Sequence, residues 1–249
     1  MHLAQAQPIH YLPVATTALS LAFLLVLLNR YRVRRSGPHL LWWAAGIAAY
    51  GLGTALESAI TLNGNTIALT KAWYIAGALL GGYPLAQGTV YLLLQRRTAH
   101  VLSAVTVPFI IGASVLVVLS PVSADALEAH RPSGAILSWQ WVRLLTPFIN
   151  LYAVVFLVGG AIYSAARYAL RGDAMNRAIG NSLIAIGAVL PGVGGAMAKA
   201  DLVEGLYVGE FIGLLLIWAG YAACVHEPRP ARAADDTGIA PVRVAQDKP

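Results

Sequence analysis

The stretch KAWYIAGALLGGYPLAQGTVYLLL, which runs from Lys71 to Leu94, decides the fold of this chain. At ~1.5 Å of rise per residue, a helix of this length reaches about 36 Å, enough to cross a hydrocarbon layer of ~30 Å. A soluble helix could be apolar on all sides over that distance only if it were wholly buried. The stretch therefore predicts a transmembrane helix, with Pro84 and Gln87 as unusual marks inside it.

The composition of the whole chain agrees with a membrane protein. Of its 249 residues, 58% are hydrophobic and only 11% are charged, with a mean hydropathy of +0.66. Ordinary soluble domains carry about 25% charged residues. One helical bundle is therefore expected rather than several domains. The single cysteine, Cys224, excludes an intramolecular disulfide and any multi-cysteine metal site.

Six further apolar runs flank the first stretch, and polar segments separate them. The sequence thus predicts an all-α, polytopic membrane protein that forms a single bundle of seven transmembrane helices within residues 1–225. The segment 226–249 is rich in proline, alanine and charge, so we expect a disordered cytoplasmic tail there. The spans are expected at about 11–29, 39–62, 71–94, 99–119, 139–168, 175–198 and 202–225.

Lysine and arginine residues indicate the orientation. The first apolar run is followed by the basic segment 30–35, whereas a cleavable signal peptide carries its positive charge before the apolar core. With seven spans, 13 of the 17 lysine and arginine residues fall on one side of the membrane. The positive-inside rule then predicts an amino terminus outside and a cytoplasmic carboxyl terminus. A bacterial inner membrane is the expected location, and the net charge of +6 does not indicate nucleic-acid binding.

Small residues and prolines indicate how the helices pack. Gly205, Gly209 and Gly213 repeat every four residues along one face of the last span, which is typical of close helix contacts in membranes. We expect this face to pack inside the bundle rather than in a dimer. Each interior proline removes a backbone hydrogen bond and is expected to kink its helix. These prolines are Pro84, Pro108, Pro147 and Pro191.

Ionisable and aromatic residues gather near the predicted outer surface. Ionisable side chains inside a membrane are costly and are candidates for function. We expect an outward-facing pocket between the second, third, fifth and seventh spans, able to bind a small amphipathic ligand or lipid. Its predicted ligand-binding residues are Glu57, Lys71, Trp73, Tyr74, Arg143, Asn150, Tyr207 and Glu210.

A second interpretation of the same charges is structural. Glu57 could pair with Lys71, and Glu210 with Arg143, so that two ion pairs fix the order of the helices. Lys71 and Arg143 could also extend to the outer interface as isolated cations. The sequence leaves these alternatives open.

Motifs of known chemistry are missing from the sequence. No two histidines lie within one span, and the HExxH, GxSxG and phosphate-loop patterns do not occur. The last span has no interior lysine for a retinal Schiff base. The sequence therefore assigns no catalytic residue, no metal ligand and no cofactor.

Two segments resemble a known family. LLWWAAGIAAYGLGTALE and the stretch from Lys71 resemble the seven-helix amino-terminal sensor region of some bacterial histidine kinases. The shared features are Trp43, Glu57, Lys71, Tyr74, Pro84 and Tyr91. The resemblance implies a sensor. The remainder after the last span is too short for a kinase domain, so a cytoplasmic signalling partner is expected to carry the output.

Three functions follow as hypotheses. The first is a receptor-like or sensor-like inner-membrane protein that binds a small amphipathic ligand or lipid from outside. The second is a small transporter or a channel for ions or protons, which requires a continuous polar route. Gln87, Asn150 and Asn181 are too few to establish that route. The third is a lipid-modifying enzyme that uses Glu57 or Glu210 as an acid or base.

Overall fold

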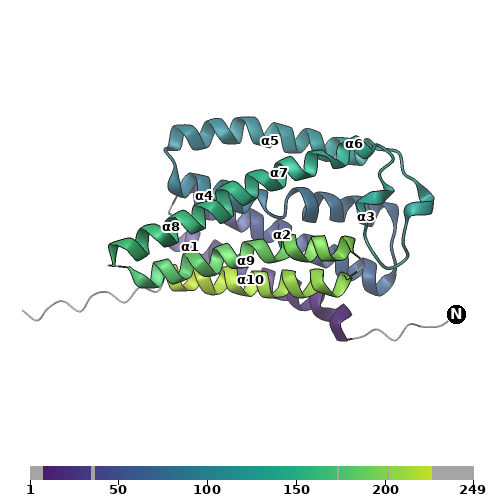
Figure 1. Ribbon diagram of the computed structural model, residues 1–249. Helices are drawn as coiled ribbons and strands as arrows, with labels where there is room; N and C mark the ends of the chain where they lie inside the picture. Colours follow the sequence, from purple (N-terminus) through teal and green to yellow (C-terminus); the bar gives the residue numbers. More distant parts are fainter. Residues whose placement is uncertain (1–7, 35–36, 173, 201, 226–249) are drawn as a thin grey trace, which may run out of the picture.

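The computed structural model describes residues 8–34, 37–172, 174–200 and 202–225, and these residues fold almost entirely into helices. Figure 1 shows the helices running roughly side by side along one direction. The predicted tail, 226–249, lies outside the described residues. The long helices are α1 (Leu12–Arg34), α2 (Pro38–Asn63), α5 (Arg96–Leu119), α9 (Met175–Lys199) and α10 (Val203–Val225). The shorter ones are η1 (Pro8–Tyr11), α3 (Ile67–Trp73), η2 (Tyr74–Leu79), α4 (Tyr83–Leu93), η3 (Ala124–Ala126), η4 (Gly134–Ile136), α6 (Gln140–Arg143), α7 (Leu145–Ala153), η5 (Val154–Val158) and α8 (Gly159–Arg171).

Among the described residues, five helical segments are long and apolar enough to cross a membrane. They are Ile9–Val33, Arg96–Leu119, Gln140–Arg171, Met175–Ala198 and Val203–Val225. The outside of the bundle is apolar, as Val105 and Ile111 on α5 illustrate, while Gln87 and Thr54 are buried inside. This distribution is expected for a protein surrounded by lipid. The chain is a helical, multi-pass membrane protein.

Two of the predicted spans, the second and the third, are not among these five segments. Helix α2 runs for 26 residues beside α1 and α4, but its tryptophans, tyrosine, glycines and Glu57 lower its hydropathy. The expectation of one continuous helix over 71–94 is wrong. The chain instead forms α3, the π-helix η2 and α4, with a bend at Gly81 and Gly82. Pro84 lies in the first turn of α4, so it begins a helix instead of kinking one.

The fifth predicted span is interrupted in a similar way. It consists of α6, α7, the π-helix η5 and α8, with a break between Arg143 and Leu145. Proline cannot donate to the carbonyl four residues earlier, and its ring crowds that carbonyl. The helices break beside Leu80 and Arg143, which lie four residues before Pro84 and Pro147. The two other prolines, Pro108 and Pro191, lie inside α5 and α9 as predicted.

The glycine face of the last span packs inside the bundle, as expected. A Cβ atom on Gly213 would lie 2.7 Å from the carbonyl oxygen of Gly187 in α9, and one on Gly209 would lie 2.8 Å from that of Leu190. Gly180 and Gly220 meet in the same manner farther along. Because only glycine fits these positions, α9 and α10 approach each other backbone to backbone (Figure 1).

The connection 120–139 folds over one end of the bundle. Val122 and Leu137 form an antiparallel bridge, and Ile136 and Leu137 are buried among the helices. Asn65, in the turn between α2 and α3, binds this connection: its Nδ2 donates to the carbonyl oxygens of Glu128 and Arg131, at 2.9 and 3.1 Å. The connection is therefore part of the folded structure, and we call this end of the bundle the capped end.

Candidate functional site

A cavity of about 970 Å³ lies at the capped end. Its walls come from α2, η2, α7, α9 and α10, and residues 131–134 of the connection contribute to its mouth. The volume falls within the range of ~300–1,000 Å³ that is usual for ligand sites. Six of the eight predicted binding residues line it. They are Glu57, Trp73, Tyr74, Arg143, Asn150 and Glu210.

Irregular backbone surrounds this cavity. Both π-helices contribute to the wall, η2 through Gly77 and Ala78, and η5 through Val154 and Val158. The bend at Gly81 and Gly82 contributes too. Isolated π-helical turns are rare and occur often at functional sites. The wider π-helical turns of η2 and η5, and the glycines that lack side chains, leave a space that regular α-helices with larger residues would fill.

Glu57 and Glu210 form a pair of neighbouring carboxyl groups in the wall of the cavity. The side chain of Glu57 is 1% exposed. Outside the pair itself, its two carboxyl oxygens and Oε2 of Glu210 are buried without a hydrogen-bond partner among the described residues. Buried polar groups normally have partners, because leaving one unpaired costs about 1–3 kcal/mol. The pair is therefore the most unusual polar feature of the cavity.

Neighbouring hydroxyl groups position the two helices that carry this pair. Tyr50 Oη donates to the backbone carbonyl of Glu210 at 2.9 Å, which connects α2 to α10. The hydroxyl groups of Tyr207 and Thr61 form a second connection at 3.2 Å. Tyr207 is buried, and it is absent from the cavity wall. Among the described residues, its hydroxyl group contacts α2 rather than the cavity.

Neither of the two proposed ion pairs is present in the described part of the chain. Lys71 Nζ donates instead to the carbonyl oxygens of Val118 and Ser120, at 2.8 and 2.7 Å. Those carbonyls lie at the carboxyl end of α5, where a cation is favoured. Arg143 donates to Oε1 of Gln140 at 2.7 Å, within its own helical turn. The two carboxyl groups therefore have no cation beside them from these residues.

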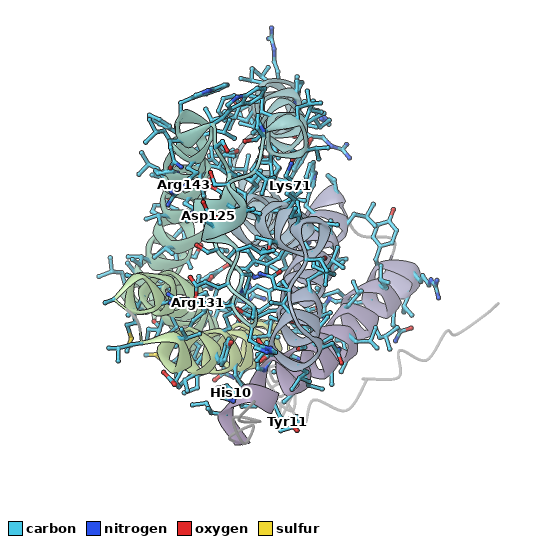
Figure 2. The ribbon with its side chains drawn as sticks, turned by 90° about the vertical axis from the view of Figure 1, so that its right-hand side faces the viewer. His10, Tyr11, Lys71, Asp125, Arg131 and Arg143 are labelled. Carbon is cyan, nitrogen blue, oxygen red and sulfur yellow. The ribbon has the colours of Figure 1, made fainter. Side chains whose placement is uncertain are left out.

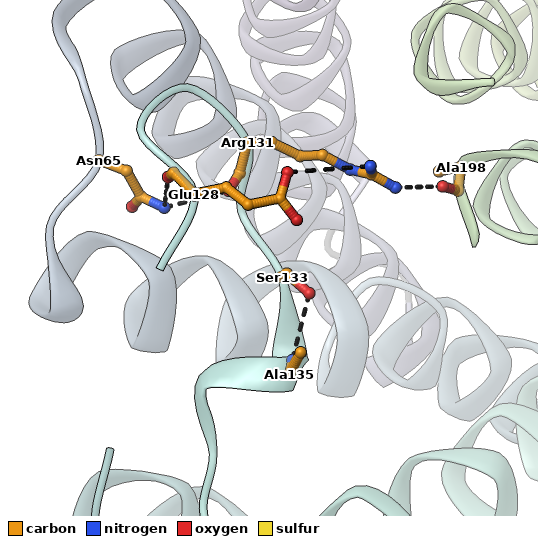
Figure 3. Close-up of polar contacts among 6 residues, drawn as sticks. All are labelled: Asn65, Glu128, Arg131, Ser133, Ala135 and Ala198. Carbon is orange, nitrogen blue, oxygen red and sulfur yellow. Dashed lines mark hydrogen bonds and ion pairs between the residues drawn. The ribbon is translucent and has the colours of Figure 1, made fainter. Parts of the chain in front are cut away.

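Arginine and tryptophan side chains stand at the mouth. Arg131 forms an ion pair with Glu128 at 3.9 Å and donates to the carbonyl of Ala198 at the end of α9 (Figure 3). Figure 2, which views the capped end, shows Arg131 and Arg143 there together with Lys71. Trp141 also lines the cavity. Sequence reasoning placed Arg131 in a connection and Trp141 at the start of a span, without assigning either to the site.

The cavity also reaches the side of the bundle. In Figure 1, α7 and α9 diverge toward the capped end. Residues on both sides of this divergence line the cavity and are also exposed: Leu144 is 64% exposed and Val154 55% exposed, and Gly192 on α9 is exposed as well. Asn150, an exposed polar residue of α7, lines the cavity between them. The cavity therefore has a lateral opening onto an apolar surface.

A hydrogen-bonded chain occupies part of the bundle beyond the cavity. Tyr152 Oη donates to Gln87 Oε1 at 2.5 Å, and Gln87 Nε2 donates to Ser103 Oγ at 2.7 Å. Tyr91 contacts Ser103 and then His100, at 3.1 and 2.9 Å. An amide donates through nitrogen and accepts through oxygen, so it does not relay a proton without changing tautomer. Gln87 therefore interrupts this chain as a proton path.

Apolar side chains fill the rest of the half of the bundle that is remote from the capped end. Helix α2 contributes Leu40 and Ile47 to this cluster, and Thr54 and Glu57, farther along the same helix, to the cavity. Phe23, Leu27, Leu85, Leu157, Leu214 and Ile217 also belong to the cluster. The cavity consequently ends within the bundle. Among the described residues, no three histidine, cysteine or acidic side chains gather as metal ligands.

The contacts of Lys71 lead to a double-mutant test. We expect Lys71→Met to lower the free energy of unfolding by about 1–2 kcal/mol, because the end of α5 loses two hydrogen bonds. In the double variant Lys71→Met/Glu57→Gln, the changes in the free energy of unfolding of the two single variants should add to within about 0.5 kcal/mol, since the two side chains do not contact each other. Unfolding in mixed micelles measures these values, with Lys71→Arg as the variant that retains a donor. A coupling energy of about 1–3 kcal/mol would restore the ion-pair interpretation.

No family model, curated protein or solved structure matches this chain. The resemblance to sensor regions therefore stays a prediction.

Proposed function

We propose that this protein is a receptor-like inner-membrane protein that binds a small amphipathic ligand or lipid in the cavity at its capped end. The carboxyl pair, Glu57 and Glu210, supports this function most strongly: both oxygens of Glu57 and Oε2 of Glu210 are buried without a partner outside the pair, in the wall of a cavity of about 970 Å³. Such a pair is costly in an apolar bundle, and costly polar groups in membrane helices are usually functional. A bound ligand would supply the missing partners.

The topology that we propose has seven crossings. Helix α2 supplies the second, and α3, η2 and α4 together supply the third, because both run the length of the bundle between apolar neighbours. A membrane-crossing helix can be interrupted where its irregular part lines a cavity within the protein instead of facing lipid. Arg96, Arg97, Arg171 and Arg177 lie at helix ends remote from the capped end. The positive-inside rule then directs the cavity outward, away from the cytoplasm.

The shape of the cavity supports an amphipathic ligand. Polar groups are available at the carboxyl pair and at Arg143, whereas the lateral opening is bordered by Leu144 and Val154. A molecule with a polar group and an apolar body could satisfy both regions at once. It could also reach the cavity sideways from the bilayer, without crossing the connection 120–139.

The cavity ends within the bundle, and this favours binding over transport. A transporter or channel needs a route through the protein, and here the far half of the bundle holds the apolar cluster around Leu27 and Ile217. The polar chain in that half is interrupted at Gln87. A lipid-modifying enzyme would need a nucleophile or an activated water beside the carboxyl pair. No serine or cysteine occurs among the described residues of the cavity wall except Ser133, at the mouth.

A sensor role would use the interrupted third helix. Tyr74, in η2, lies in the cavity wall, and its hydroxyl group contacts that of Thr146 in α7 at 2.7 Å. A ligand in the cavity would contact both η2 and α7. Helix α4 continues from the bend at Gly81 and Gly82 to the far end of the bundle, so a movement of η2 could reach that end. A cytoplasmic partner that contacts that end would then receive the signal. This assignment rests on the resemblance and on the position of η2.

The orientation is tested by labelling single cysteines. In a Cys224→Ser background, Asp125→Cys places a thiol in the connection at the capped end, and Thr98→Cys places one in the first turn of α5. Both positions are exposed. We expect a membrane-impermeant maleimide to label the first variant in intact spheroplasts and the second only after lysis. Labelling of both, or the reverse order, would contradict the proposed topology.

The binding function is tested by native mass spectrometry of protein purified in mild detergent. We expect the wild-type protein to retain a small molecule or a specific lipid, and Glu57→Gln and Glu210→Gln to lose it. The matched control is Glu204→Gln, since Glu204 lies on the same helix as Glu210 but is exposed and outside the cavity wall. Wild-type protein without any adduct, or identical adducts in all four proteins, would refute the proposal.

A further inference from the structure

The charge of the carboxyl pair points to the chemical class of the ligand. Two neighbouring carboxyl groups in a buried site do not both ionise readily, because like charges repel and burial disfavours each charge. A pair that shares one proton carries a single negative charge. In the described part of the chain, no lysine, arginine or histidine forms a salt bridge with Glu57 or Glu210. A carboxyl pair in this singly charged state is matched in charge to one monovalent cation.

The burial and the unpaired oxygens of Glu57 also indicate a ligand site. Glu57 is almost fully buried, and both of its carboxyl oxygens lack partners while the residue lines the cavity. Each oxygen can accept a hydrogen bond from a donor in the cavity. An ammonium group offers donors and a positive charge but no acceptor. Its chemistry complements that of the unpaired oxygens.

Aromatic rings in the same wall suit an organic cation better than a metal ion. Trp73 and Tyr74 lie next to each other, with ring centroids 6.5 Å apart, and both line the cavity with Trp141. The faces of tryptophan and tyrosine rings attract ammonium groups, and such rings are typical of sites for organic amines. Ca²⁺ and Mg²⁺ take oxygen ligands, which the ring faces of this wall do not offer. The apolar lateral opening leaves room for the rest of the molecule.

We propose that the ligand is an organic monocation, an ammonium group on an apolar body, whose nitrogen binds between Glu57 and Glu210 while the apolar part lies toward the opening between α7 and α9. This inference rests on the proposed function, since it names the ligand class of the same cavity. The ammonium group can belong to a free amine or to the headgroup of a lipid. Arg143 at the mouth then remains available for an anionic group of a zwitterionic headgroup.

The first experiment compares three soluble probes with the same chain and different charge: octylamine, octanol and octanoate. Full-length protein in nanodiscs is titrated with each probe, and thermal unfolding is recorded, because a ligand that binds only the folded state raises the unfolding temperature. We expect octylamine to raise it in a saturable manner and octanoate to leave it unchanged. Equal effects of octylamine and octanol would show that the pair holds two protons and would overturn the inference.

Variants locate the effect. We expect Glu57→Gln and Glu210→Gln to bind octylamine roughly tenfold or more weakly, because each removes a charged acceptor. Glu204→Gln should bind it like the wild type. Trp73→Leu, which keeps an apolar side chain at the wall, should weaken the binding of octylamine more than the binding of octanol. If one glutamate variant does not fold, the other variant and Trp73→Leu still decide the outcome. Unchanged octylamine binding in the folded variants would contradict the proposal.

The second experiment distinguishes the source of the ammonium group. Nanodiscs of phosphatidylethanolamine and of phosphatidylglycerol are used in turn, and the protein is released for native mass spectrometry. Retention of phosphatidylethanolamine that octylamine displaces identifies a lipid headgroup, whereas octylamine binding without retained lipid identifies a free amine. Retention of phosphatidylglycerol that octylamine does not displace would refute the cation but leave the binding function intact. A protein that retains no lipid and whose unfolding temperature does not respond to any probe would refute both the cationic ligand and the binding function.

Discussion

Backbone groups inside a membrane must find hydrogen-bond partners within the protein, and the rest of this structure depends on that constraint. A helix can break at membrane depth only where the freed groups face protein or a cavity. Here both interrupted passages, at Gly81 and Gly82 and beside Arg143, break next to the same cavity. Pro84 and Pro147 produce those breaks. The cavity and the irregular helices are thus two aspects of one arrangement.

That arrangement explains why the carboxyl pair can exist. Glu57 and Glu210 come from helices α2 and α10, which Tyr50 and Tyr207 connect through hydrogen bonds. Gly77, Gly81 and Gly82 line the same cavity and have no side chains to fill it. The glycines of α9 and α10 hold those two helices close together. The same packing keeps the far half of the bundle tight and apolar.

Much of the fold could be predicted from the sequence, because apolar runs, glycine spacing and basic clusters are local features. Six of the predicted site residues do line one cavity, since helix registers place them at the same depth. What could not be predicted depends on contacts between distant segments. Lys71 reaches the end of α5 rather than Glu57, and Arg131 reaches α9 through a folded connection. The π-helical turns also have no pattern of their own, so a single continuous third helix was expected.

We propose that a ligand binds at the carboxyl pair, Glu57 and Glu210. A cryo-electron microscopy map of the full-length protein in lipid nanodiscs, compared with a map of the Glu57→Gln variant, would show such a ligand. We expect elongated non-protein density between Glu57 and Glu210 in the wild type, extending toward the opening between α7 and α9, and its loss in the variant. A wild-type map in which protein side chains close the cavity and pair with both carboxyl groups would contradict it.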